Sequence, residues 1–189
     1  MKTKSRLSNP SNKAMDEFVI AEYTALRDEI IKRSEFRYQL ISLTVIIAGS
    51  ILTFGLQPNA PASVLFIFPI LGCLLAGVWA HNVIGPRYIA IFIKEHIESR
   101  FRGFGWETIV ETERYSFSWL SGIIATGGIY IVSEIVTLVL GFLKSSFTLI
   151  DIVLIGLDIV AIFVTLLILR SATVKPKSEP YLRTRKFLK

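Results

Sequence analysis

Three acidic residues, Glu134, Asp151 and Asp158, stand inside long runs of apolar residues. An ionised carboxylate at the centre of a lipid bilayer costs about 2.5–3.5 kcal/mol on insertion scales, and more in simulations. No Lys or Arg lies inside the four apolar runs of the chain to neutralise these acids. We therefore expect the carboxyl groups either to be protonated or to contact water and cations.

The spacing of the acids indicates how deep they lie. Glu134 and Asp158 are each nine residues from the end of an apolar run, which is roughly 13–14 Å of helix rise. The sequence therefore predicts two carboxyl groups at one level on neighbouring antiparallel helices. Tyr130 and Thr137 share the face of Glu134, and Asp151 shares the face of Asp158 nearer the helix end.

Two interpretations of these acids remain open at this stage. In the first, Glu134, Asp158, Asp151 and Tyr130 line a cation pathway or a proton relay. In the second, Glu134 and Asp158 share a proton and hold two helices together, because polar side chains bridge membrane helices. Asp151 by itself is typical of a solvated residue at the membrane interface.

Motifs of soluble enzymes are absent from the sequence. It contains no phosphate-binding loop, no dinucleotide fingerprint and no Cys/His spacing typical of a metal site. Its two histidines, His81 and His96, are too far apart in sequence for a typical zinc site, and the single Cys73 fits a small buried hydrophobe. We expect no enzyme activity, no metal and no cofactor.

A second group of polar residues lies in the basic segments that flank the apolar runs. Basic residues there suit an anionic ligand. We consider six of the polar residues in these segments as contacts for a trigger or ligand: Arg33, Arg37, His81, Asn82, Arg87 and His96. In the alternative interpretation of residues 79–82 there is no ligand contact. Trp79 is then a headgroup-level aromatic residue, and His81 and Asn82 are ordinary polar residues at a helix end.

The elements that must position these residues are transmembrane helices. The chain has 189 residues, of which 52% are hydrophobic, and a mean hydropathy of +0.55, above the usual range for soluble domains. Runs of about 20 apolar residues predict membrane spans. The sequence predicts an all-α integral membrane protein with two transmembrane hairpins, 40–80 and 119–169, whose four spans are 40–56, 62–80, 119–143 and 149–169.

Four further segments lie outside the spans. Residues 1–13 are polar and predicted to be disordered, 14–39 to form an amphipathic helix, 81–118 to be a connection that holds an interfacial amphipathic helix, and 170–189 to be a basic tail. An apolar stripe of Val19, Tyr23, Leu26 and Ile30 marks the first of these helices. It would lie on the inner leaflet, pack on neighbouring cytoplasmic segments, or form a short coiled-coil seam.

The orientation follows from the positive charges. Of the 21 Lys and Arg residues, twenty lie before the first span, between the second and third spans, or after the fourth, and one lies in the turn between the third and fourth. Cytoplasmic loops carry the excess of Lys and Arg. Both termini and the 81–118 connection are therefore predicted to be cytoplasmic.

Four strings of residues carry a family resemblance. They are residues 22–33 (EYTALRDEIIKR), the span end 79–82 (WAHN), and the pair 93–98 (IKEHIE) and 105–107 (GWE). Together they resemble a family of small bacterial inner-membrane proteins, over about residues 22–107. Some members of that family are regarded as transmembrane effectors of anti-phage defence systems of nucleotide-signalled or retron type.

The resemblance implies a function for this chain as well. It would be a homo-oligomeric effector in the bacterial inner membrane that rearranges or oligomerises when triggered and then depolarises the membrane. The resemblance also implies a cyclic nucleotide as a candidate ligand and a cognate defence-system partner, with no direct binding of nucleic acid. The alternatives are a small proton- or cation-coupled transporter or channel that uses Glu134 and Asp158, and a structural or assembly subunit.

Overall fold

A computed structural model of the protein describes residues 10–100, 105–107, 109 and 117–174. Its long helices are α1 (Pro10–Gly55), α2 (Ser63–Phe92), α4 (Phe117–Lys144) and α5 (Leu149–Thr173), and a π-helix η1 (Ile93–Ile97) and a 3-10 turn η2 (Glu98–Arg100) continue α2. Four helices are long and apolar enough to cross a membrane. The predicted all-α architecture with four helices that could span a membrane is thus confirmed for the described part of the chain.

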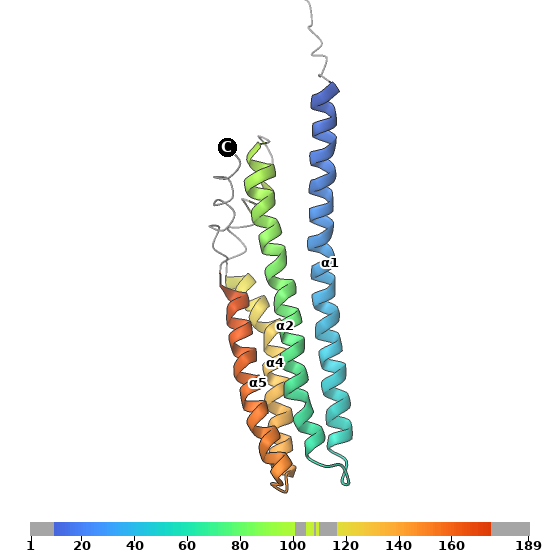
Figure 1. Ribbon diagram of the computed structural model, residues 1–189, viewed down its shortest axis with the longest axis vertical. Helices are drawn as coiled ribbons and strands as arrows, with labels where there is room; N and C mark the ends of the chain where they lie inside the picture. Colours follow the sequence, from blue (N-terminus) through green and yellow to red (C-terminus); the bar gives the residue numbers. More distant parts are fainter. Residues whose placement is uncertain (1–9, 101–104, 108, 110–116, 175–189) are drawn as a thin grey trace, which may run out of the picture.

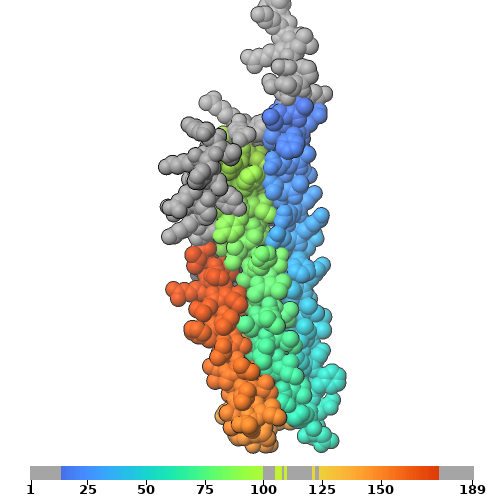
Figure 2. Space-filling view, viewed as in Figure 1, coloured from blue at the N-terminus to red at the C-terminus, as the bar shows by residue number. Residues whose placement is uncertain are grey.

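The helices form an elongated bundle in which α2 is central and packs against α1, α4 and α5. Figure 1 shows both short turns, 56–62 and 145–148, at the same end of the bundle, which we call the turn end. At the opposite end α1 and α2 run on past the ends of α4 and α5 (Figures 1 and 2). We call this two-helix extension the stalk.

The predicted separate N-terminal helix at 14–39 is wrong. Residues 14–39 belong to α1, which continues without a break through the first apolar run to Gly55. No Gly or Pro occurs between Pro10 and Gly49, so nothing in the sequence ends the helix at the membrane boundary. Of the segment predicted to be disordered, residues 10–13 are helical, and residues 1–9 lie outside the described part.

The predicted separate interfacial helix between the second and third spans is also wrong. The second apolar run ends at Ala80, but α2 continues through Pro86 to Phe92 and then into η1. A proline is tolerated inside a membrane helix where neighbouring groups satisfy the freed carbonyl. Packing explains the extension, because Ala90, Ile93 and Ile97 are buried and η1 contacts α1.

The apolar stripe near the N-terminus faces into the stalk. Val19, Tyr23, Leu26 and Ile30 are half-buried, and α1 packs along α2 and η1. The same spacing of three and four residues continues to Leu40 and Thr44, which are buried. One seam of α1 therefore serves both the stalk and the bundle.

At the turn end the two hairpins are tied together. Lys144 at the end of α4 donates a hydrogen bond of 2.7 Å to the carbonyl of Gly55 and another to the carbonyl of Gln57. A cation at the carboxyl end of α1 also complements the helix dipole. At the other end α5 runs to Thr173, so the first residues of the predicted tail 170–189 are helical, and 175–189 lie outside the described part.

Candidate functional site: a buried polar file

Glu134 is the centre of the site. Its side chain is fully buried, and its Oε1 accepts a hydrogen bond of 2.9 Å from the hydroxyl of Thr165 on α5. Gly72 on α2 makes room for the carboxyl group, since a Cβ atom built there would lie 2.9 Å from Oε1. Three helices therefore meet around one carboxyl group.

Asp158 on α5 is the second fully buried acid. Neither of its carboxyl oxygens has a hydrogen-bond partner among the described residues, and the same holds for Oε2 of Glu134. A buried polar atom without a partner costs free energy, so we expect these three oxygens to be protonated or to contact water or cations.

Glu134 and Asp158 do not bond to each other among the described contacts. The Glu134 carboxyl group bonds instead to Thr165, which follows Asp158 by seven residues of α5, or roughly 10 Å of helix rise. Thr165 therefore lies on the stalk side of Asp158. The described contacts thus differ from the interpretation in which the two acids share a proton, and their common level in the membrane stays a prediction.

Hydroxyl groups extend the site in both directions along the bundle. Tyr130 is fully buried one turn from Glu134, and its hydroxyl lies beside the Thr44 side chain of α1 without the geometry of a hydrogen bond. Thr137, also fully buried, donates to the carbonyls of Ser133 and Glu134. We call the whole set the polar file: Asp158, Thr137, Glu134, Thr165, Tyr130 and Thr44.

Two members of the polar file, Thr44 and Thr165, were missed by the sequence reasoning. A signal existed for Thr165, because Asp151, Asp158 and Thr165 recur every seven residues and so share one face of α5. Thr44 lies in the same seam of α1 as the stripe described above. Threonine is common in membrane helices as an ordinary packing residue, so residue type alone did not single out either one.

Asp151 has a different role from the other acids. It is buried, contrary to the expectation of a solvated residue. Its carboxylate accepts hydrogen bonds from the Thr148 amide (3.2 Å) and the Ser145 hydroxyl (3.0 Å), and its own amide donates to Thr148 Oγ1. This reciprocal arrangement is a capping box. We therefore assign Asp151 to the start of α5 and not to the polar file.

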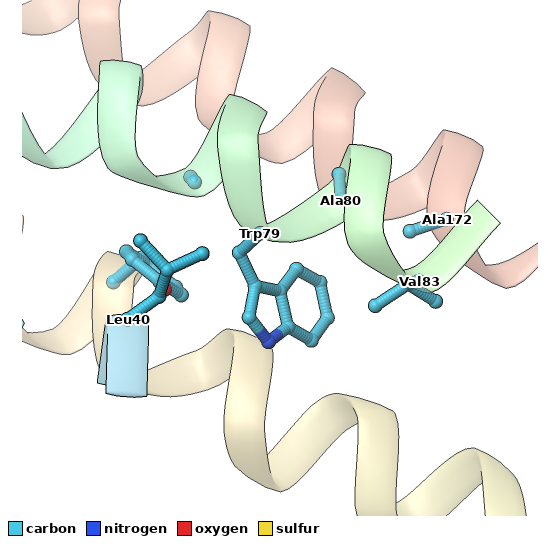
Figure 3. Close-up of a cluster of buried hydrophobic side chains, with 7 residues drawn as sticks. Leu40, Trp79, Ala80, Val83 and Ala172 are labelled. Carbon is cyan, nitrogen blue, oxygen red and sulfur yellow. The ribbon is translucent and has the colours of Figure 1, made fainter. Parts of the chain in front are cut away.

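The polar file ends toward the stalk at a cluster of apolar side chains. Trp79 is buried, and its ring centroid lies 6.0 Å from that of Tyr130. Figure 3 shows the Trp79 indole between α2 and α4, with Leu40 on one side and Val83 on the other. Trp79 is thus a core residue, and its interpretation as a headgroup-level residue is wrong. We call this cluster the apolar plug: Leu40, Ala76, Trp79, Ala80, Val83 and Ala172.

Beyond the apolar plug, toward the stalk, α1 and α2 carry several of the predicted ligand-contact residues. Arg33 bonds to Glu29 and lies against Gly85. Arg37 is half-buried one turn further along α1, and Asn82 is buried, with its amide donating to the Val78 carbonyl.

The other three predicted ligand contacts, Arg87, His81 and His96, lie elsewhere on α2 and η1. Arg87 is buried and donates to the Val174 carbonyl after α5. His81 is exposed, and His96 is half-buried and stacks on Phe92 with 4.6 Å between ring centroids. The six residues are thus spread over the base and the length of the stalk.

An ion pair that the sequence did not indicate lies in the stalk. Nη1 of Arg27 on α1 is 2.5 Å from Oε1 of Glu107, which is buried. The Glu107 amide in turn donates a hydrogen bond of 2.9 Å to Oε1 of Glu98. Arg27 also donates to the Tyr23 hydroxyl. These contacts join α1 to the end of α2 and to the segment after it.

The residues present do not form an evident metal site. Across 10–100, 105–107, 109 and 117–174, no group of three or more His, Cys, Asp or Glu side chains is close enough to hold a metal ion. Comparison with protein-family models, curated proteins and solved structures gave no match. Function is therefore inferred from the geometry of the polar file, the apolar plug and the stalk.

Proposed function

We propose that this protein is a gated membrane effector that depolarises a bacterial inner membrane by admitting protons or small cations along the polar file. The observation that carries this proposal is a pair of fully buried acids, Glu134 and Asp158, with three carboxyl oxygens that lack hydrogen-bond partners in the described structure. Intramembrane acids of this kind commonly mark ion paths and proton relays.

The arrangement fits conduction better than a purely structural role. Acids that only hold helices together would be expected to bond to each other or to neighbouring groups, as buried polar groups normally do. Here one oxygen of Glu134 is held by Thr165 while the other is left unpaired. Hydroxyl groups such as those of Tyr130 and Thr44 both donate and accept, and they can therefore pass a proton or coordinate water beyond Glu134.

The described conformation corresponds in this proposal to the closed state. Apolar constrictions close channels by excluding water, and the apolar plug lies between the polar file and the stalk. α1 supplies Leu40 to the plug, Thr44 to the polar file and half of the stalk. A tilt of α1 would therefore change both plug and file, which gives a trigger bound at the stalk a mechanical route to the pathway.

The biological setting comes from the family resemblance. In that setting the stalk is cytoplasmic, as the distribution of Lys and Arg predicts, and a nucleotide signal or a partner protein of an anti-phage defence system acts on it. Opening, with or without assembly into a homo-oligomer, would then depolarise an infected cell. A housekeeping transporter could use the same polar file, but its expression should be tolerated by the host.

The test is proton and cation flux into liposomes that contain the purified full-length chain. Because the wild type is closed at rest in this proposal, the flux is measured in a Leu40→Asn background, in which a polar side chain replaces part of the apolar plug. We expect flux in that background and at least a tenfold fall when Glu134→Gln and Asp158→Asn are added. Asp151→Asn, added in the same way, is the matched control, because it also neutralises a buried acid but lies outside the polar file. Equal flux with and without the two substitutions would remove the acids from the mechanism. No flux from any variant, together with harmless expression, would favour the structural subunit.

A further inference from the structure

Two arginines lie one turn apart on the face of α1 that meets α2, where the stalk joins the bundle. Arg33 and Arg37 are both half-buried there. Gly85 of α2 provides the space, since a Cβ atom built on it would lie 2.7 Å from Nη1 of Arg33. The Arg33 guanidinium thus lies against α2 in the space left by the missing side chain of Gly85, and Arg37 follows it one turn along α1. We call this part of the α1–α2 seam the groove.

The charge of this groove is only partly balanced. Nε and Nη2 of Arg33 both bond to one oxygen of Glu29, at 2.9 and 2.7 Å. Arg37 donates from Nη2 to the Ser34 hydroxyl at 2.9 Å, which carries no charge, and its Nε is buried without a hydrogen-bond partner among the described residues. A guanidinium with free donors binds phosphate oxygens with favourable geometry.

The groove lies at the level where lipid headgroups are expected. Phe36 and Tyr38 flank Arg37 and are 44% and 66% exposed, as is typical of aromatic residues at a membrane interface. Large apolar side chains are exposed on α1 beyond them, among them Leu43 and Val45. On the other side α1 exposes charged residues such as Lys32.

From this geometry we propose that the groove between α1 and α2 binds the phosphate group of an anionic phospholipid, with Arg33 and Arg37 as donors. Basic pockets between membrane helices on the cytoplasmic side are a recurrent site for such headgroups. The lipid would bridge α1 and α2 at the base of the stalk, one turn from Leu40 of the apolar plug. This binding site goes beyond the proposed conduction and does not depend on it.

The experiment measures thermal unfolding of the full-length chain in neutral detergent. Phosphatidylglycerol, phosphatidylcholine and inorganic phosphate are titrated separately. We expect phosphatidylglycerol to raise the Tm of the wild type and the other two to leave it unchanged. The concentration of phosphatidylglycerol that gives half of the shift should rise roughly tenfold in Arg37→Gln, as expected for the loss of a charge-assisted hydrogen bond.

Two further variants serve as a charge control and as a second test of the binding site. Arg170→Gln removes an exposed arginine at the end of α5 and should bind the lipid like the wild type. Gly85→Ala keeps every charge but fills the groove, and it should weaken binding even if Arg37→Gln fails to fold. Equal lipid binding by the wild type, Arg37→Gln and Gly85→Ala would overturn the proposal. Stabilisation by inorganic phosphate that matches the lipid effect would overturn the lipid as ligand in favour of a soluble phosphate.

Discussion

The hydroxyl of Thr165 donates a 2.9 Å hydrogen bond to Oε1 of Glu134, and both side chains are fully buried. This contact joins α4 to α5 and fixes one of the two oxygens of the carboxyl group. The other oxygen has no partner in the described part of the chain. One bond thus orients the acid, and the other oxygen is the one that the proposed conduction would use.

Replacing Thr165 by Val should show whether its hydroxyl group orients the Glu134 carboxyl group or only stabilises the fold. Valine keeps the shape but not the donor, so we expect a small loss of stability, about 1 kcal/mol, as measured for hydrogen bonds between membrane helices. Proton flux in liposomes should fall more clearly, because Glu134 loses its orientation. Thr165→Ser retains the donor and should behave like the wild type. A Thr165→Val variant with unchanged flux would contradict the positioning role.

Gly72 should be intolerant of even a methyl group. In Gly72→Ala the added Cβ would lie 2.9 Å from Oε1 of Glu134, so the carboxyl group must move away from Thr165. We expect reduced flux and a lower Tm in detergent. Gly156→Ala on α5 is the control, because nothing lies within 4 Å of a Cβ built there. Similar behaviour of the two variants would show that the space at Gly72 is unimportant.

A polar side chain in the apolar plug should open the pathway at rest. Leu40 is buried beside Trp79, and Leu40→Asn would admit water to a constriction that excludes it by its apolar character. We expect depolarisation of expressing cells, read with a voltage-sensitive dye, and loss of that effect when Glu134→Gln is added. Leu40→Met, which nearly conserves volume, should remain closed. Depolarisation that persists with Glu134→Gln would indicate a non-specific leak.

Asp151 should matter for stability and not for flux. Its carboxylate caps α5 through Thr148 and Ser145, and loss of such a cap costs about 0.5–2 kcal/mol. We therefore expect Asp151→Ala to lower the Tm measured by circular dichroism while proton flux per folded molecule stays unchanged. A loss of flux without a change in Tm would instead place Asp151 in the conduction pathway.

The ion pair of Arg27 and Glu107 should hold the stalk together. Glu107 is buried, whereas Arg27 is partly exposed, so Arg27→Met leaves a buried carboxylate short of its counter-ion, which destabilises by up to about 3–5 kcal/mol. We expect faster protease cleavage of the stalk in Arg27→Met and partial recovery in Arg27→Met/Glu107→Gln. Additive effects of the two substitutions would mean that the pair contributes no coupling.

Much of the fold is contained in the local sequence. Runs of about 20 apolar residues predict membrane helices, because each backbone polar group must be satisfied within the helix. The four candidate spans and the positions of Glu134 and Asp158 within them were therefore accessible without a structure. The sequence did not predict where α1 begins and where α2 ends, because the charged residues before Leu40 and after Ala80 indicate the edge of a membrane but do not stop a helix.

Tertiary structure alone decided which side chains meet. The register between α4 and α5 lets Thr165 donate to Glu134, and counting residues from the helix ends cannot reveal this bond, because it depends on how the two helices pack. The same holds for Trp79, whose side chain suits a membrane interface as well as a core. Its burial against Tyr130 depends on how closely α4 approaches α2. Composition and spacing thus determined four apolar helices with acids inside them, whereas helix-to-helix register, set by contacts far apart in sequence, decided that those acids meet hydroxyl groups beside a cluster of apolar side chains.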